Sequence, residues 1–111
     1  MLAGHRGLAR LTVVVDRNRL QQGAGTEETS ALDPLDAKWR AFGWKVVGVD
    51  GHDVGALLSV LGEPVGARQR PLCVIADTIK GKGVSFMEGV ASWHHGVPGD
   101  TQFAAAMGEL V

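Results

Sequence analysis

Three short runs of mostly apolar residues, rich in β-branched side chains, stand out along the chain. They cover residues 11–15, 45–50 and 72–76, and each is followed by polar residues or glycine. A short, continuous apolar run is typical of a strand that is buried on both faces, as strands in parallel sheets are. The pattern therefore predicts three strands of one parallel sheet.

A helical pattern occupies residues 34–42, between the first two predicted strands. The segment begins with a proline, Asp33 before it is a suitable N-cap, and Gly43 is a suitable stop. Trp39 and Phe42 recur at helical spacing within it. We expect both aromatic side chains to face the sheet.

Two further helices are predicted later in the chain. One is capped by Asp53 and runs to about Leu61, and the other is capped by Asp100. In contrast, residues 21–30 have too little apolar content for a core element and predict a surface loop. The apolar side chains expected to face a core are Val54, Leu57, Leu58 and Leu61 in the first helix, and Phe103, Ala106, Met107 and Leu110 in the second.

Strands that alternate with helices predict an α/β fold, with a parallel sheet, flanking helices and right-handed crossovers. The 111 residues are enough for one core at most, so the chain is a small domain or a piece of a larger one. Residues 2–9 have the pattern of the last turns of a helix without its N-cap. We therefore expect residues 1–111 to form part of a domain that is incomplete at its start.

Composition narrows the class of protein. The 11 Lys and Arg residues balance the 12 Asp and Glu residues, which argues against a nucleic-acid surface or a polybasic membrane anchor. No apolar run is long enough to span a membrane, and the start lacks the apolar core of a signal peptide. The single cysteine, Cys73, lies in an apolar run and can form no internal disulfide. These features predict a soluble protein of the cytoplasm.

The first predicted strand is followed by oxygen-bearing side chains. Asp16 and Asn18 offer carboxylate and amide oxygens, and Leu20 offers its backbone carbonyl. Oxygen atoms are the ligands that Mg²⁺ and Ca²⁺ prefer. The alternative is an ordinary turn, because Asp and Asn side chains accept hydrogen bonds from nearby backbone, and the spacing alone favours that turn.

A second polar segment, residues 78–83, follows the third predicted strand. Its two glycines and two lysines, Lys80 and Lys82, suit a loop that binds phosphate. The residue order is not that of a P-loop, and a solvated basic hairpin explains it equally well. Further on, His94 and His95 are candidates for proton transfer or anion binding, with a surface pair as the default alternative. Adjacent side chains of an extended chain point apart, so we expect only one histidine to act.

Six segments of the chain share a pattern with a known family. They are residues 2–5, 13–21, 26–28, 35–44, 49–53 and 78–88, and the hexapeptide Trp39-Arg40-Ala41-Phe42-Gly43-Trp44 is the most specific part. In order and spacing these segments resemble the thiamine-diphosphate-binding half of transketolases. The resemblance covers nearly the whole chain and is closest to the bacterial form in which transketolase is split into two subunits.

The resemblance implies a set of metal and cofactor ligands. Asn18 resembles the asparagine that binds Mg²⁺ in this family, and Leu20 resembles the residue whose carbonyl binds the same ion, with Ca²⁺ as a possible substitute. Asp16 resembles an acidic residue that lines the thiamine diphosphate pocket. Two donors from this chain, Asn18 and Leu20, are thereby implied for the metal ion.

The resemblance also implies residues that contact the cofactor further along the chain. Ile79 resembles an apolar residue packed near the thiazolium ring, and Lys80 beside it lines the pocket. His94 or His95 resembles a histidine that contacts the cofactor diphosphate and the donor sugar. The preceding tryptophan favours His94 and the following glycine favours His95; we take His94 as the catalytic residue.

The chain departs from the family pattern in two ways. No Gly-Asp-Gly motif is present, although its aspartate is the charged metal ligand of the family, and Gln22 stands where many relatives have an apolar residue. A neutral amide and a carbonyl do not replace a carboxylate ligand of Mg²⁺. We therefore expect weak cofactor binding by the chain alone, and a homo- or hetero-oligomer in which a protein partner supplies the pyrimidine-binding half.

The implied reaction is transfer of a two-carbon ketol unit between sugar phosphates, with the carbanion chemistry supplied by the cofactor. One alternative is another thiamine-diphosphate enzyme of specialised biosynthesis that transfers a two-carbon unit to a different acceptor. The other is a non-catalytic interaction or regulatory remnant of such an enzyme. The missing Gly-Asp-Gly motif is the main support for the remnant.

Overall fold

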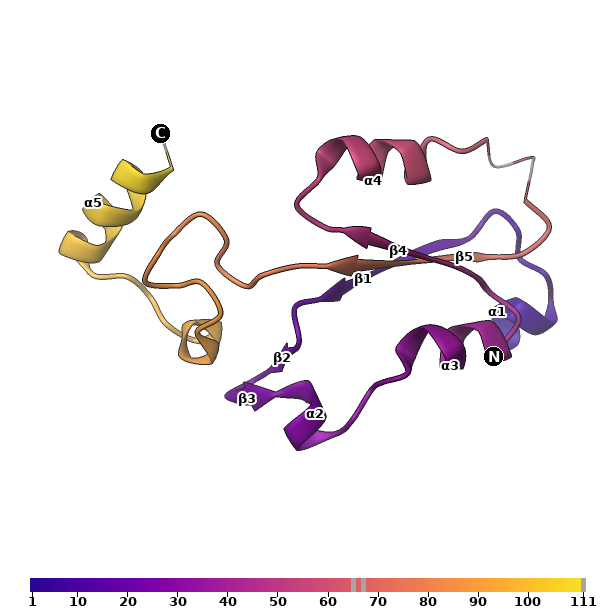
Figure 1. Ribbon diagram of the computed structural model, residues 1–111, viewed down its shortest axis with the longest axis horizontal. Helices are drawn as coiled ribbons and strands as arrows, with labels where there is room; N and C mark the ends of the chain where they lie inside the picture. Colours follow the sequence, from indigo (N-terminus) through magenta and orange to yellow (C-terminus); the bar gives the residue numbers. More distant parts are fainter. Residues whose placement is uncertain (65, 67, 111) are drawn as a thin grey trace. The chain divides into compact units, whose positions relative to one another are not determined.

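The computed structural model of the chain describes residues 1–64, 66 and 68–110. It divides the chain into two compact units (Figure 1). The first unit consists of residues 1–17 and 32–78, and the second consists of residues 18–31 and the part from Ile79 onward. The chain therefore leaves the first unit after Arg17, returns to it at Leu32, and leaves it again after Thr78.

The first unit is built on a three-stranded parallel sheet. Its strands are β1 (Thr12–Arg17), β4 (Lys45–Asp50) and β5 (Leu72–Asp77), in the spatial order β1-β5-β4. The three strands predicted from the sequence are confirmed, although β1 and β5 continue past their apolar runs to include a polar end. The predicted α/β fold with a parallel sheet and flanking helices is also confirmed.

The central strand β5 carries the core of this unit. Every side chain from Leu72 to Ala76 is buried, and Cys73 is fully enclosed, as its apolar surroundings in the sequence predict. The edge strand β1 is less well covered, and Val14 is 51% exposed although its neighbour across the ladder, Val74, has no exposed surface. The sheet is thus buried at its centre and open along β1.

Helices lie on both sides of the sheet. Figure 1 shows α3 (Leu35–Ala41) and α4 (Val54–Leu61) on opposite sides of the strands, as right-handed crossovers in opposite directions require. Trp39 of α3 packs against the core and meets Trp44 edge-to-face, with ring centroids 4.8 Å apart. The core cluster consists of Trp44, Val46, Cys73 and Ile75, with Ala3 of the short helix α1 (Leu2–His5) packed against it.

The start and end of α3 differ from the prediction. Pro34 is the N-cap, and the Asp33 carboxylate instead pairs with Arg17, at 3.3 Å between Oδ1 and Nη2. Arg17 is only 4% exposed, and a buried charge without a partner is strongly destabilising. The Asp33 carboxylate therefore stabilises the fold more by pairing with Arg17 than by capping the helix. Phe42 is 45% exposed rather than facing the sheet, because the helix ends at Ala41 and Phe42 is its C-cap.

The predicted cap of α4 is confirmed, but its predicted apolar face is wrong. Asp53 Oδ1 accepts a hydrogen bond from the Ala56 N–H at 2.9 Å. Leu57 is half-buried, whereas Val54, Leu58 and Leu61 are 67%, 68% and 47% exposed. A two-layer contact with one sheet covers only a narrow stripe of this helix, so most of its apolar side chains face outward.

The second unit begins with a small hairpin. Strands β2 (Leu20–Gln21) and β3 (Ala24–Gly25) pair antiparallel, and helix α2 (Thr26–Thr29) follows directly. Most of residues 21–30 are exposed, as the predicted surface loop requires, but the prediction missed these short strands and the helix. Thr26 is buried, and its N–H bonds the Arg19 carbonyl at 2.9 Å, which closes the hairpin onto the helix.

The remainder of the second unit contains the 3₁₀ helix η2 (Ala91–His94) and helix α5 (Asp100–Glu109). The N-cap of α5 is Gly99 and not Asp100, which is instead the first helical residue. Ala106 is buried as predicted, but Phe103, Met107 and Leu110 are at least 49% exposed. None of the helices in the described part of the chain is long and apolar enough to cross a membrane.

Candidate functional site

A polar cavity lies within the second unit. It has a volume of about 270 Å³ and is lined by Asn18, Leu20, Gln21, Gln22, Lys80 and His94. Four of the six predicted site residues, Asn18, Leu20, Lys80 and His94, thus come together although they are far apart in the sequence. This is the candidate functional site.

Asn18 sits in a tight turn directly after β1. Its side-chain Oδ1 accepts a hydrogen bond from the Leu20 N–H at 2.9 Å, and Arg19 between them has a φ of 63°. The turn that the spacing favours is therefore present. An amide oxygen has two lone pairs, so Oδ1 keeps one for a further donor or a metal ion. The turn and the ligand role are compatible.

The hairpin after this turn provides two lining residues that the sequence did not single out as a site. Gln21 ends β2, and Gln22 begins the turn with a φ of 55°. Positive φ is uncommon for a residue other than glycine, and at Gln22 it forms a tight bend of the hairpin. Both glutamines of this bend line the cavity. The one signal in the sequence was Gln22, which stands where many transketolases have an apolar residue.

Lys80 is half-buried and lies at the start of a glycine-rich loop. The Lys80 carbonyl accepts a hydrogen bond from the Gly89 N–H at 2.9 Å, which closes the loop. Glu88 accepts a hydrogen bond from the Gly83 N–H at 2.9 Å and pairs with Lys82 at 3.6 Å. Only one of the two lysines therefore lines the cavity, and the loop does not offer a set of free backbone donors as a P-loop does.

His94 and His95 lie close together, contrary to the expectation for extended chain. His94 ends η2 and His95 caps it, and their ring centroids are 4.5 Å apart at 81°. The turn of the 3₁₀ helix brings the rings together, because its side chains do not alternate as those of a strand do. His94 lines the cavity, while His95 Nε2 lies 3.3 Å from Gln22 Oε1.

The short helix η2 is held by its tryptophan. Trp93 Nε1 donates to the Phe86 carbonyl at 3.0 Å, and the two rings pack with centroids 5.5 Å apart. This contact joins the end of the glycine-rich loop to the segment that carries His94. The contact of Trp93 with Phe86 therefore helps to position the segment that carries His94.

The remaining two predicted site residues lie outside the cavity lining. Asp16 belongs to the first unit, where its Oδ1 accepts a hydrogen bond from the Thr78 hydroxyl. Ile79 follows Thr78, is 44% exposed, and is not among the described residues that line the cavity. Their predicted contacts with a cofactor remain a prediction.

The cavity combines oxygen ligands with groups that suit an anion. Asn18 and the Leu20 carbonyl are hard oxygen donors, while Lys80 supplies a positive charge and His94 an imidazole. Among the described residues no group of three or more His, Cys, Asp or Glu side chains is placed to hold a metal ion. The donor set therefore fits a metal ion that is already bound to an anion, and not an isolated ion.

Comparisons with known proteins show the family of the chain. The family model "Transketolase, thiamine diphosphate binding domain" matches residues 1–109. The chain is 40% identical over 103 residues to an apulose-4-phosphate transketolase subunit of Phocaeicola vulgatus, and the match covers 93% of the chain and 37% of that protein. It is 39% identical over 110 residues to the 6-deoxy-6-sulfo-D-fructose transketolase subunit SqwG of a Clostridium species, over 99% of the chain and 40% of the relative.

Solved structures show the same fold. The chain matches transketolase from Campylobacter jejuni with a TM-score of 0.85 at 24% identity, over 98% of the chain and 17% of that structure. It matches transketolase from Leishmania mexicana with a TM-score of 0.84 at 28% identity, over 98% of the chain and 16% of that structure. The chain spans less than half the length of the two curated relatives and a smaller share of these structures. The match over residues 1–109 shows that the chain belongs to the family of transketolase thiamine diphosphate-binding domains.

Proposed function

We propose that this chain is a component of a transketolase-like enzyme that transfers a two-carbon ketol unit between sugar phosphates with Mg²⁺ and thiamine diphosphate. The observation that carries the proposal is the cavity of the second unit, where Asn18, Leu20, Lys80 and His94 converge. The cofactor, when bound, supplies the carbanion chemistry. The residues of the chain bind and orient it.

The cavity suits the diphosphate end of the cofactor. Its volume of about 270 Å³ is below the roughly 300–1,000 Å³ of a pocket that encloses a whole drug-sized ligand. Lys80 would neutralise part of the diphosphate charge, while the free lone pair of Asn18 and the Leu20 carbonyl would hold the Mg²⁺ ion. The rest of the cofactor requires surfaces beyond this cavity.

The other site residues have supporting roles in this proposal. His94 would donate a hydrogen bond to the diphosphate or the donor sugar, and His95, through its contact with Gln22, would fix the orientation of that segment. By the family resemblance, Asp16 would line the cofactor pocket and Ile79 would pack near the thiazolium ring. The contact between His95 and Gln22 is present without the cofactor, whereas the contacts of His94, Asp16 and Ile79 would form only when it binds.

The chain contributes too few charged ligands to bind Mg²⁺ tightly by itself. Asn18 and the Leu20 carbonyl are both neutral, whereas Mg²⁺ is usually held by at least one carboxylate together with phosphate oxygens. No carboxylate is among the described residues that line the cavity. For the pyrimidine-binding half, the source we propose is a protein partner, as the curated relatives are named as subunits.

A specialised sugar substrate is the second candidate. The curated relatives are named for apulose 4-phosphate and for 6-deoxy-6-sulfo-D-fructose, which are different sugars. The same two-carbon transfer with a less common donor or acceptor would use the same cavity. This candidate changes the sugar and leaves the roles of Asn18, Lys80 and His94 unchanged.

Cofactor binding is the first test, measured by calorimetry with Mg²⁺ and thiamine diphosphate. We expect weak binding by the chain alone, and a further loss of about tenfold in Lys80→Ala, because a charge-assisted contact is removed. Lys82→Ala is the matched control, since Lys82 lies in the same loop but pairs with Glu88. Micromolar binding by the chain alone would contradict the incomplete site, and equal losses in the two lysine variants would contradict the role of Lys80.

Activity with a partner is the second test. The chain is mixed with candidate pyrimidine-half subunits, Mg²⁺, thiamine diphosphate and a pentose phosphate donor, and ketol transfer is followed with several acceptor sugars. We expect activity only in the mixture, with a larger loss in His94→Ala than in His95→Ala because His94 lines the cavity. If the chain showed no cofactor binding and no activity with any partner, that result would support the non-catalytic remnant.

A further inference from the structure

A second cavity lies in the first unit, at the amino end of the parallel sheet. It has a volume of about 440 Å³, and it lies where β4 and β5 begin, next to the end of α3. Its position is opposite the carboxyl end of the same sheet, where Asp16, Asp50 and Asp77 are found. The residues that line it are Arg40, Trp44, Lys45, Val46, Arg68, Gln69 and Arg70.

The lining carries four cationic side chains, of which two are paired with carboxylates. Lys45 Nζ lies 2.8 Å from Glu63 Oε2, and Arg40 Nε lies 3.6 Å from Asp36 Oδ2. The hydrogen bond and charge of Lys45 lower the pKa of the Glu63 carboxyl, with a smaller effect from the charge of Arg68. Among the described residues, Arg68 and Arg70 have no ion pair, so the cavity keeps an excess of positive charge.

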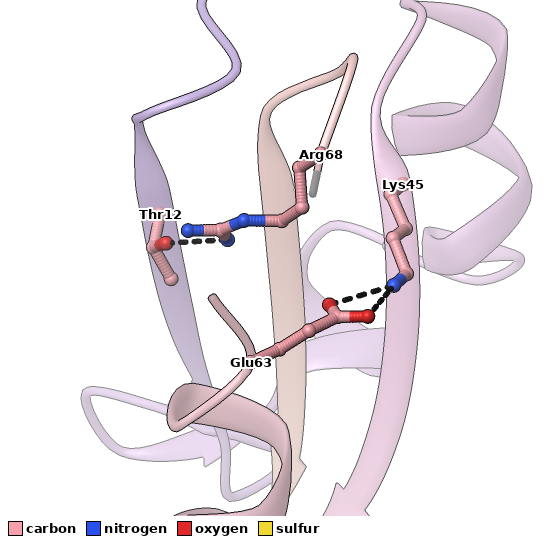
Figure 2. A network of polar contacts seen from close by, with 4 residues as sticks. All are labelled: Thr12, Lys45, Glu63 and Arg68. Carbon is pink, nitrogen blue, oxygen red and sulfur yellow. Dashed lines mark hydrogen bonds and ion pairs between the residues drawn. The ribbon is translucent and has the colours of Figure 1, made fainter. Parts of the chain in front are cut away.

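Arg68 is held in place by a neutral partner. Figure 2 shows its side chain reaching toward Thr12 on β1, while Glu63 reaches toward Lys45 on β4. Arg68 Nη1 donates to the Thr12 hydroxyl at 2.9 Å. This contact orients the guanidinium group without neutralising it, and leaves its other N–H groups available for an acceptor.

Two buried donors of the lining residues have no acceptor among the described residues. They are Arg68 Nε and Trp44 Nε1. Trp44 is only 6% exposed, so its indole N–H is removed from bulk water. Leaving such a donor unpaired is destabilising, which makes a bound acceptor the simplest explanation. A water molecule would accept one hydrogen bond but would not balance the charge of Arg68 and Arg70.

We propose that this cavity binds the phosphate group of a small molecule. The guanidinium groups of Arg68 and Arg70 offer forked donors that match phosphate oxygens, and the Trp44 N–H adds a neutral donor. A phosphate group provides several acceptor oxygens and up to two negative charges, which correspond to the two unpaired guanidinium groups. The carboxylates of Asp16, Asp50 and Asp77 lie at the other end of the sheet and do not repel it. The residues that line this cavity all belong to the first unit.

The three indole N–H groups of the chain allow a direct test by two-dimensional ¹H–¹⁵N NMR. The full chain is titrated with inorganic phosphate, with glycerol phosphate and with sodium chloride at matched ionic strength. We expect a saturable shift of the Trp44 indole signal, assigned with Trp44→Phe, and no shift of Trp93, which already donates to the Phe86 carbonyl. Tighter binding of glycerol phosphate would identify a phosphate ester as the ligand, and equal binding would identify free phosphate; both support the site.

Variants separate the site from general charge effects. Arg70→Gln and Arg68→Gln are each expected to weaken phosphate binding about tenfold, as loss of a charge-assisted hydrogen bond does. Arg6→Gln, which changes an exposed arginine outside the lining, is the matched control. Arg70 is exposed, so its variant remains informative if Arg68→Gln fails to fold. Equal shifts with chloride, equal affinity for acetate, or unchanged binding in Arg70→Gln would overturn the proposal.

Discussion

The two units of the chain are stabilised in different ways. The first unit contains most of the buried apolar side chains among the described residues, and these lie on β4 and β5 or next to them. In the second unit, only Val84 and Ala106 are buried apolar residues of the described part. Its structure depends on tight turns, on backbone hydrogen bonds and on carboxylate contacts such as Ser85 with Glu109.

The first unit is a rigid scaffold, and the second unit carries the candidate functional site. An apolar sheet is rigid because its stability comes from many contacts that form together, whereas a unit held by turns opens locally at low cost. The candidate functional site lies wholly in the second unit. We therefore expect cofactor or partner binding to stabilise the second unit much more than the first.

The largest expected effect is the loss of a core side chain from the first unit. Leu72→Ala removes a leucine that is 1% exposed, and it should lower the free energy of unfolding by about 2–5 kcal/mol. Leu110→Ala in the second unit is the matched control, since Leu110 is 59% exposed and its loss should cost less than about 0.5 kcal/mol. Urea unfolding followed by circular dichroism measures both. Equal losses of unfolding free energy in the two variants would contradict the difference in packing between the units.

A backbone change in the second unit should have the next largest effect. Gly81 has a φ of 72°, and an added Cβ would lie 2.7 Å from the Met87 carbonyl oxygen. Gly81→Ala should therefore cost about 1–3 kcal/mol, and more than Gly89→Ala, where φ is 69° but no atom is within 4 Å. Hydrogen exchange should become faster at the Val84 and Gly89 amides and stay unchanged in β5. Faster exchange in β5 would show that the two units unfold together.

The reactivity of Cys73 tests whether the first unit stays closed. Burial raises the pKa of the Cys73 thiol to about 11, so the reactive thiolate is scarce in the folded chain at pH 8. Alkylation should be slow until denaturant is added. Because the unfolded thiol ionises near its ordinary pKa of 9.0, stability should fall as pH rises from about 9 to about 11. Rapid alkylation without denaturant would show that the sheet opens readily.

The smallest effect is expected from a surface ion pair of the first unit. Lys45 lowers the pKa of the Glu63 carboxyl below 4.5, so the pair stabilises the fold above that pH and its contribution is lost as pH falls. Glu63→Gln should lower the melting temperature slightly at pH 7, and by less as the pH is lowered below 4.5. Lys82→Ala, which removes a similar pair with Glu88 in the second unit, gives the comparison. A Glu63→Gln effect that does not depend on pH would exclude the ion pair as its cause.

The parallel sheet could be predicted from the sequence because its strands are apolar throughout. The Asp53 cap was also predictable, since it depends on residues within one turn. The exposure of Phe42 and Leu58 was not, because it depends on how much of each helix the sheet covers. The hairpin of residues 20–25 was missed because its strands are two residues long and it has no apolar pattern.

The candidate site was predicted through family resemblance more than through local pattern. Spacing alone could not connect Asn18 with Lys80 and His94, which lie far apart in the sequence. The closeness of the His94 and His95 rings was missed because it depends on a single 3₁₀ turn, which no pattern in the sequence predicts. The second cavity was missed because its charges come from separate elements and only the fold assembles them.

The strand order of the sheet has a consequence for biosynthesis. The strands β1 and β4 each pair only with β5 in the described sheet, and β5 is the last of the three to be made. About 60 residues must therefore be synthesised after Thr12 before its ladder partner Leu72 is made. Ladders between such distant segments form slowly, and the unpaired strands are exposed until then. In a nascent chain on the ribosome, β1 and β4 therefore lack their ladder partner until Leu72–Asp77 has left the exit tunnel.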